Sequence, residues 1–354
     1  MAPRIGVVGV GTFGIQHLRA FKQMEHAGEA VLAAASDVNP DRLKEMCDEF
    51  GIRGYADYRE MLEQEELDGV SVATPDFLHR EIAVAALQSG RHVLVEKPLD
   101  VTLEGCEEMI EAAGDRVLLQ VDFHKRYDPY HVELERLVGL GKLGEVLYGY
   151  CHMEDRIEVP RDWFPQWAPK SSPVWFLGVH FYDLARWVIK SDGKSVFARG
   201  QKRKLTSLGV DTYDSVQAQV EFQNGAVVTF DTSWILPDQF EAIVNQGIRL
   251  VGTEGVIEVD SQDRGARSCF ASDGMQTHNL GFMRETTDRQ GRTLFQGYGI
   301  ESIAEFATNV GFLLDGGAVQ ALTGRYASGR DGLEVTRIAC AVDESLRTGR
   351  VASL

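Results

Sequence analysis

The stretch RIGVVGVGTFG, residues 4–14, decides the fold of the N-terminal part of the chain. Its first half is almost entirely apolar, which is typical of a buried parallel strand. Glycines then follow in the spacing G-x-G-x-x-G, at Gly9, Gly11 and Gly14. The next residues, FGIQHLRAFKQ, have the apolar spacing of a helix. The stretch therefore predicts a strand, a tight glycine turn and a helix that begins at the turn.

The same alternation of strand and helix continues along the first third of the chain. Further apolar stretches that are each followed by a helical or loop pattern are AVLAAASD, GVSVATP, HVLVEKP and RVLLQVDF. Strands that are apolar on both faces and alternate with helices are typical of a parallel sheet covered on both sides. The pattern changes after residue 123, so we predict one domain at 1–123 and a second at 124–354. The final helix of the second domain can pack back on the first.

Longer alternating stretches in the second part predict an antiparallel sheet. They are residues 214–234, 241–246 and 248–260. Asn224-Gly225 lies inside the first of them, and this dipeptide between alternating runs is typical of a hairpin turn. Residues 261–299 are polar and rich in glycine and give no clear pattern, whereas 301–314 and 332–349 predict two closing helices.

Composition excludes several classes of partner. The 354 residues include 36 Lys and Arg against 53 Asp and Glu, a net charge of −17, which argues against nucleic acid and anionic membrane surfaces. The five cysteines are widely spaced without a C-x-x-C pair, so we expect no disulfide framework and a reducing cytoplasm. We expect no signal peptide, since the chain enters its first strand almost at once, and no apolar run has the length of a membrane span.

The glycine turn has the position and spacing of a dinucleotide-binding loop. Glycines there allow a tight turn, a close approach of the pyrophosphate and tight helix packing, and Thr12 and Phe13 complete the loop. Asp37 ends the second strand, at about the distance along the chain expected of the acid that holds the adenine ribose. A carboxylate there repels a 2′-phosphate and no arginine follows directly. The predicted cofactor is therefore NAD rather than NADP.

Two further stretches carry groups that can move protons. Glu96-Lys97-Pro98 follow a predicted strand, and ligands of open α/β sheets bind beyond the carboxyl ends of the strands. Lys97 can there stabilise an alkoxide or relay its proton, although such a tripeptide is also common in solvated loops. In VWFLGVHFYDLARW, residues 174–187, a helix would place Phe176 and His180 on one face with Asp183 and Trp187. His180 can accept a proton, or it can be a core histidine.

Several motifs in the same order resemble the Gfo/Idh/MocA oxidoreductase family, which includes glucose–fructose oxidoreductase and inositol 2-dehydrogenase. They are GVGTFG (9–14), ATPDFLH (73–79), EKP (96–98), FHKRYDP (123–129), GVHFYDLARW (178–187), GTEGVIEV (252–259) and the C-terminal stretch 331–351. The resemblance covers nearly the whole chain. It implies an α/β protein with an N-terminal Rossmann doubly wound parallel sheet and a C-terminal domain with a large, mostly antiparallel open sheet. One face of that sheet would form a homodimer or homotetramer.

The resemblance also implies hydride transfer between NAD(P) and a sugar, an inositol or a related polyol. Lys97 matches the catalytic lysine of the family, and His180 its usual catalytic histidine. Glu96 belongs to the same motif as Lys97. The positions that match the cofactor site elsewhere are Thr74, Pro75 and His79. No metal is expected.

The chain departs from the family at Phe176, where many members carry Asp four residues before the histidine. Lys97 and His180 can suffice, with Phe176 against an apolar face of the substrate. Alternatively, Asp155 or Asp122 supplies the acid, or catalysis is lost and a sensor or scaffold remains. A redox-neutral reaction of a glycoside with tightly bound NAD is a further alternative.

An aromatic segment between residues 159 and 175 indicates the substrate class. Tryptophan faces stack on sugar rings while polar neighbours bind the hydroxyls, although tryptophans can also simply anchor a loop. A basic pair, His124 and Lys125, borders the predicted site and would also suit a carboxylate or phosphate on the substrate. The predicted substrate residues are His124, Lys125, Asp155, Arg156, Trp163, Trp167, Trp175, Phe176 and His180.

Overall fold

The computed structural model describes residues 1–260, 267–270, 274–277 and 283–354. Contacts between residues divide the chain into two compact units. The first contains Met1–Tyr127 and Met283–Thr336, and the second contains Asp128–Phe282 and Arg337–Leu354. The predicted boundary after residue 123 stays a prediction; by these contacts residues 283–336 lie with the first unit. Helix α10 (Gly329–Thr348) contributes residues to both units.

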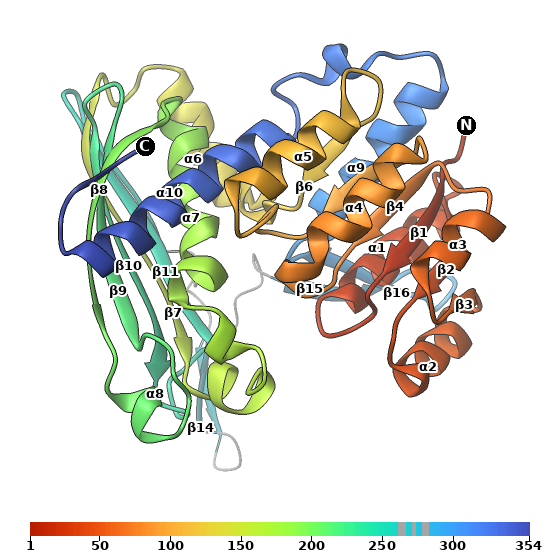
Figure 1. Cartoon of the computed structure of the whole chain (residues 1–354), viewed down its shortest axis with the longest axis horizontal. Coiled ribbons are helices and arrows are strands. Elements are labelled where there is room, and N and C mark those ends of the chain that lie inside the picture. Colours follow the sequence, from red (N-terminus) through yellow and green to blue (C-terminus); the bar gives the residue numbers. More distant parts are fainter. Residues whose placement is uncertain (261–266, 271–273, 278–282) are drawn as a thin grey trace. The chain divides into compact units, whose positions relative to one another are not determined.

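The first unit contains a six-stranded parallel sheet in the order β3-β2-β1-β4-β5-β6 (Figure 1). Its strands are β1 (Arg4–Val8), β2 (Val31–Ser36), β3 (Arg53–Tyr55), β4 (Gly69–Val72), β5 (His92–Val95) and β6 (Leu119–Val121). The strand order reverses at β1, which confirms the predicted doubly wound sheet. The loops that follow β1, β2, β4, β5 and β6 therefore open at one edge.

Helices connect these strands, as the alternating pattern predicted. They are α1 (Gly14–Ala27), α2 (Pro40–Phe50), α3 (Tyr58–Gln64), η1 (Asp76–Leu78), α4 (His79–Gln88) and α5 (Leu103–Ala113). In α2, Asn39 caps the first turn through the backbone N–H groups of Asp41 and Arg42, Pro40 takes the first helical position, and Gly51 ends the helix with φ +66°. These local signals mark both ends of the helix.

Helix α9 (Ile300–Leu314) completes the core of the first unit from far along the chain. It packs against α1, where the fully buried rings of Phe21 and Phe306 lie 6.5 Å apart in an edge-on arrangement. A Cβ atom added to Gly69 of β4 would lie 3.0 Å from the Phe306 ring, so the glycine makes room for it. Each buried phenylalanine stabilises the unit by about 1.5–3 kcal/mol. The first unit also contains the elements η2 (His124–Tyr127), β15 (Met283–Thr287), β16 (Thr293–Gly297) and η6 (Val319–Leu322).

The second unit contains a seven-stranded sheet in the order β12-β11-β7-β10-β9-β8-β17. Its strands are β7 (Val146–Arg156), β8 (Gly193–Gln201), β9 (Ser215–Phe222), β10 (Val227–Leu236), β11 (Val244–Gly252), β12 (Val256–Asp260) and β17 (Ala352–Ser353). Only the β7–β10 pair is parallel among these described strands, which confirms the mostly antiparallel sheet. The hairpin at Asn224-Gly225 is confirmed, with φ +89° at the glycine.

Two predictions for the second unit were wrong in detail. Residues 241–246 are not a separate strand, because only the last three belong to β11, which then continues to Gly252. The single helix predicted over 174–187 is a π-helical turn, η5 (Val174–Gly178), followed by α7 (Val179–Ile189). The other helical segments are α6 (Pro129–Gly139), η3 (Val159–Trp163), η4 (Ala168–Lys170) and α8 (Lys204–Ser207), and β13 (Arg267–Phe270) pairs with β14 (Gly274–Thr277).

The two faces of the second sheet differ. One is covered by helices: Tyr182 of α7 packs edge-on against Phe230 of β10 with ring centres 4.9 Å apart. The other face exposes Tyr148, Tyr150 and Phe197. Within the described residues, no helix combines the length and the apolar composition needed to cross a bilayer.

Candidate active site

The three glycines in the loop between β1 and α1 have different structural roles. Gly9 has φ +88°, and a Cβ there would lie 2.6 Å from the carbonyl oxygen of Ala73. A Cβ on Gly14 would lie 2.0 Å from the loop's own backbone, so α1 can pack this closely only with glycine. A Cβ on Gly11 would meet nothing within 4 Å, and no side chain caps the first turn of α1. This open side of the loop fits a pyrophosphate at the helix N-terminus.

A cavity of about 410 Å³ lies beside this loop. Asp37 lines it, and its carboxylate accepts the backbone N–H groups of Val10 and Asn39, each at 2.8 Å. The hydroxyl oxygen of Thr74 is buried and has no hydrogen-bond partner among the described residues. A hydrogen-bonding ligand would satisfy it, so the cavity fits the adenosine half of a dinucleotide. The predicted cofactor residues that line the cavity are Gly9, Gly11, Asp37, Thr74 and Pro75.

Lys97 follows β5 at the same edge of the sheet, and its peptide bond to Pro98 is cis. The side chain is buried, and its ammonium nitrogen lies 5.8 Å from the centre of the Phe13 ring. The Phe13 ring in turn lies 6.3 Å from Tyr298, which lies 5.6 Å from the ring of His124. The structure thus places Phe13 and His124 on either side of Tyr298, and Lys97 over the Phe13 ring.

Tyr298 was missed in the sequence because it lies in the polar stretch that gave no pattern. The flanking glycines, both with positive φ, and the positive φ of +47° at Tyr298 itself mark a tight turn. The sequence GYG was the available signal. Only the return of residues 283–336 to the first unit, however, brings this turn beside His124.

His79 lies behind the cofactor loops rather than on their surface. It is buried, its Nδ1 lies 2.8 Å from the carbonyl oxygen of Pro98, and its Nε2 lies 3.0 Å from that of Thr74. The imidazole therefore connects the loop after β4 with the loop that carries Lys97. We assign it to the support of both loops.

A buried group of acids and bases lies next to Lys97. The Nε2 atom of His17 lies 3.2 Å from the Glu96 carboxylate and 4.0 Å from that of Asp122, while Ser71 lies 2.6 Å from Nδ1. Asp122 also hydrogen-bonds to Ser302 of α9. The metal-ligating atoms of His17, Glu96 and Asp122 all lie within 4.8 Å of one another, but hydrogen bonds account for these contacts. We assign protons to this group rather than a metal.

The pKa values of Asp122 and Glu96 shift in opposite directions. Burial raises the pKa of Asp122 to about 7, and the negative charge of Glu96 adds to this effect. Burial would also raise the pKa of Glu96, but the hydrogen bond and charge of His17, with Lys97 and His124, outweigh it and lower the pKa to about 2. Such a pair carries one proton between two acids over a wide pH range.

In the second unit, His180 and Asp183 lie on α7 and are both buried. Phe176 lies before them in the π-helical turn, where its ring centre is 5.2 Å from Trp167, 5.8 Å from Phe164 and 6.1 Å from Trp234. The position that carries Asp in many relatives thus belongs to an aromatic cluster here. Phe164 and Trp234 were not predicted, since nothing in the sequence pairs them with Phe176.

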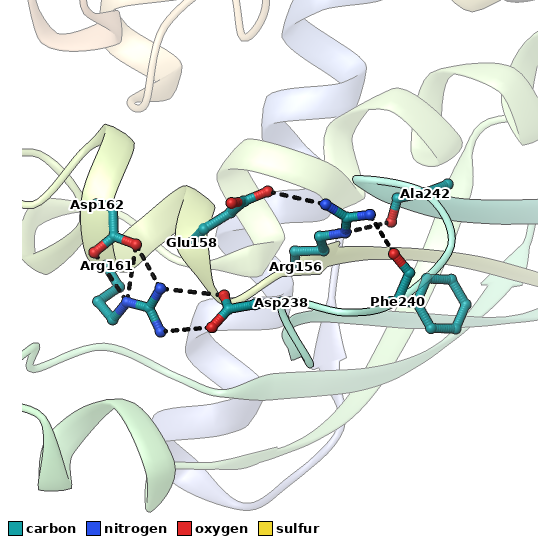
Figure 2. Close-up of polar contacts among 7 residues, drawn as sticks. All are labelled: Arg156, Glu158, Arg161, Asp162, Asp238, Phe240 and Ala242. Atoms are coloured by element: carbon teal, nitrogen blue, oxygen red, sulfur yellow. Dashed lines mark hydrogen bonds and ion pairs between the residues drawn. The ribbon is translucent and has the colours of Figure 1, made fainter. Parts of the chain in front are cut away.

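Two other predicted substrate residues of this unit, Arg156 and Trp175, stabilise loops through hydrogen bonds. Arg156 donates to the carbonyl oxygens of Phe240 and Ala242 and pairs with Glu158 (Figure 2). Trp175 is buried and donates its indole N–H to Asp343 at 2.8 Å. Both side chains therefore anchor loops in the structure.

The remaining predicted residues fall into buried and exposed positions. Asp155 is buried on β7, and Lys125 is buried in η2 of the first unit. Trp163 is 47% exposed. Next to it, Arg161 pairs with Asp162 and with Asp238 of the segment after β10 (Figure 2).

A doubly wound sheet with an open glycine loop, an acid after β2 and a buried lysine after β5 defines a dinucleotide-dependent Rossmann protein. The chain belongs to the Gfo/Idh/MocA family. Residues 3–123 match the model described as "Oxidoreductase family, NAD-binding Rossmann fold", and residues 131–258 match the GFO/IDH/MocA C-terminal domain. The predicted family and NAD-binding domain are confirmed.

Relatives of known name agree with this assignment. Inositol 2-dehydrogenase 2 of Saccharopolyspora erythraea is 32% identical over 64% of this chain and 66% of its own length. Myo-inositol 2-dehydrogenase of Thermotoga maritima is 29% identical over 73% of this chain and 75% of its own. The match to the first relative thus spans slightly less than two thirds of its length.

Solved structures share the fold over the whole chain. Scyllo-inositol dehydrogenase from Lactobacillus casei with bound NAD(H) and scyllo-inositol has a TM-score of 0.77 at 19% identity, covering 100% of this chain and 99% of its own. A probable dehydrogenase from Thermotoga maritima has a TM-score of 0.77 at 25% identity, covering 99% and 98%.

Proposed function

We propose that this protein is an NAD-dependent dehydrogenase that acts on a hydroxyl group of a sugar, an inositol or a related polyol. The observation that supports it most is the buried Lys97 at the carboxyl edge of the Rossmann sheet, 5.8 Å from the ring of Phe13 in the dinucleotide loop. The substrate class is supported by relatives named inositol 2-dehydrogenase at 29% and 32% identity.

In the proposed reaction, Lys97 and His180 have separate roles. His180 accepts the proton of the substrate hydroxyl, and the Lys97 ammonium stabilises the alkoxide that forms. Bound NAD⁺ supplies the hydride acceptor. Phe176 and its aromatic neighbours offer an apolar surface to the C–H side of a ring. The first explanation of the missing Asp, that Lys97 and His180 suffice, is the one this cluster favours.

The first test is NADH formation from NAD⁺ across a panel of inositols, aldoses, sugar acids and glycosides. Lys97→Met keeps the side-chain length, removes the charge and should lower kcat about 10²–10⁴-fold while NAD binding persists. Lys44→Met is the matched control, because Lys44 is exposed and forms an ion pair with Asp48 on the surface of α2. Full turnover in Lys97→Met would refute the role of Lys97.

A second candidate is an NAD-binding sensor without turnover. The observation behind it is Phe176 itself, because a phenylalanine cannot accept a proton where many relatives carry Asp. A sensor would bind a polyol in the presence of NAD⁺, as measured by calorimetry, and form no NADH. Release of a sugar from a glycoside without net NADH would instead indicate the redox-neutral reaction.

We also propose that the protein is a homodimer or homotetramer through the exposed face of the second sheet. Tyr148 and Tyr150 of β7 and Phe197 of β8, with β10 and β9 between these strands, expose large apolar side chains. Light scattering should give a multiple of the 39.3 kDa chain mass. Tyr150→Lys should shift the mass toward the monomer.

A further inference from the structure

The segment that follows β7, residues 159–170, carries two of the aromatic rings around Phe176. Phe164 and Trp167 are half-buried, as is Phe176 itself. Trp234 of β10, the fourth ring of the cluster, is fully buried. Three of these four rings therefore keep surface that a ligand can touch.

The segment has little regular structure that would fix the position of its rings. Its helical turns, η3 and η4, are short, and only three of the twelve residues are buried, so hydrophobic packing holds it weakly. The backbone N–H of Phe164 donates to Val159 and that of Ala168 donates to Phe164, at 3.1 Å and 2.8 Å. These bonds do not reach a strand, so contacts of side chains decide where the segment lies.

Arg161 joins the segment to the loop after β10 (Figure 2). Its two terminal nitrogens, Nη1 and Nη2, donate to the two carboxylate oxygens of Asp238 at 3.2 Å and 3.1 Å. Such a paired contact fixes orientation as well as distance, because the guanidinium is planar and its donors have a fixed geometry. Asp238 lies two residues beyond the end of β10, so the segment is tied to the strand that carries Trp234.

The loop that carries Asp238 is itself held in place by Arg156. The Arg156 side chain donates to the carbonyl oxygens of Phe240 and Ala242 (Figure 2). Arg156 ends β7, and its backbone N–H donates to the carbonyl oxygen of Ile243 at 2.9 Å. Asp238 therefore belongs to a loop that is anchored to the sheet.

We propose that Arg161 and Asp238 are positioning residues: their ion pair holds residues 159–170 against the loop after β10 and so sets the aromatic surface around Phe176 that a substrate ring meets. The role in substrate binding rests on the proposed dehydrogenase function, whereas the position of the segment is a property of the protein without substrate. Arg161 also pairs with Asp162, but that contact stays within the segment.

Two variants each remove one carboxylate from the same arginine, so they form a matched pair. Asp238→Asn removes the partner outside the segment, and Asp162→Asn removes the partner inside it. Hydrogen exchange followed by mass spectrometry should show the amides of 159–170 exchanging about two- to fivefold faster in Asp238→Asn, because an exposed ion pair shifts a local equilibrium by up to about this factor.

The control variant should behave differently. Asp162→Asn should exchange at the wild-type rate or more slowly, since Arg161 then has Asp238 without a competing carboxylate. Wild-type exchange in Asp238→Asn, or equal acceleration in both variants, would overturn the proposal.

A second replacement separates charge from shape. The side chains of Arg161 and Asp238 are 34% and 39% exposed, so the Tm of Asp238→Asn should stay within about 2 °C of the wild type. Asp238→Glu keeps the carboxylate on a longer side chain and should restore at least about half of the lost protection. A role of Asp238 in packing alone predicts the reverse, because asparagine is the closer match in shape. Slower exchange in Asp238→Asn than in Asp238→Glu would contradict the ion pair.

With an active, uncharged polyol, Asp238→Asn should raise KM about two- to fivefold and keep kcat within about twofold, because the aromatic surface contacts the ring before and during hydride transfer alike. Asp162→Asn should leave both constants unchanged. Sodium chloride at about 0.5 M should raise the wild-type KM toward that of Asp238→Asn and change the variant little, because salt screens a partly exposed pair.

A lower kcat at unchanged KM in Asp238→Asn would refute the positioning role. If no substrate of the panel is turned over, the proposed function fails, while hydrogen exchange still decides how the segment is held.

Discussion

Replacing Asp37 by Ala should weaken NAD binding by about one to two orders of magnitude. Each carboxylate oxygen of Asp37 accepts one backbone N–H, from Val10 and Asn39, and retains further acceptor capacity toward the cavity. A hydrogen bond from a ribose hydroxyl to an ionised group contributes about 1.5–3 kcal/mol. At 1.4 kcal/mol for each factor of ten, this is about 10- to 150-fold in Kd.

The structure places the expected loss toward the upper end of that range. The same carboxylate holds the N–H of Val10, which lies inside the glycine loop, so alanine also loosens the loop itself. Asp37→Asn keeps one acceptor oxygen and removes the charge that repels a 2′-phosphate. It should therefore lose less affinity for NAD and reduce the preference for NAD over NADP.

Isothermal titration of NAD⁺ and NADP⁺ into the protein without substrate measures both effects. Asp57→Asn is the matched control, because Asp57 lines the same cavity but caps α3 through the N–H of Arg59. It should change Kd for NAD less than threefold, or about 0.6 kcal/mol. Wild-type affinity in Asp37→Ala, or an equal loss in Asp57→Asn, would refute the assignment of the adenosine site.

Three further predictions concern packing and pH. Phe176→Ala should lower the free energy of unfolding by about 3–5 kcal/mol in urea titrations, because it empties the aromatic cluster. Gly14→Ala should unfold the loop region and abolish NAD binding, since its Cβ would lie 2.0 Å from a carbonyl oxygen, whereas Gly11→Ala should fold normally and lose only affinity. Trp175→Phe should lower the free energy of unfolding by about 1.5–3 kcal/mol at pH 7, because it removes the hydrogen bond to the Asp343 carboxylate. Burial raises the pKa of Asp343, while the Trp175 hydrogen bond opposes this shift. The loss of stability should therefore be smaller at acid pH, where Asp343 is protonated and depends less on the indole donor. A loss of unfolding free energy that grows as pH falls would contradict this role of the Trp175–Asp343 hydrogen bond.

Most of the first unit could be predicted because its strands and helices carry local signals. Apolar runs marked the strands, and the glycine spacing marked the turn into α1. Strand β3 was missed, because two of its three residues are exposed and it has no apolar run. The place of α9 in this unit was not predictable, since an amphipathic pattern shows which face is buried but not which sheet buries it.

The candidate site was predictable where a motif is contiguous and not where the contact is long-range. Asp37 and Lys97 could be assigned from their positions after strands, because the carboxyl ends of parallel strands share an edge. Tyr298 and Ser302 reach His124 and Asp122 only through the fold, from more than a hundred residues away. The opposite pKa shifts of Asp122 and Glu96 depend on burial and on neighbouring charges, which no motif encodes.

Phe176 shows why a missing catalytic residue is better understood from its neighbours than from the motif alone. The sequence says that Asp is absent, which leaves both altered chemistry and lost chemistry open. In the structure the Phe176 ring packs among Phe164, Trp167 and Trp234, so this position belongs to an aromatic cluster. A carboxylate restored there would lose much of its hydration against these rings, at a cost of several kcal/mol. In the proposed reaction, this cluster would offer an apolar surface to the substrate ring, and proton transfer would rest with His180 and Lys97.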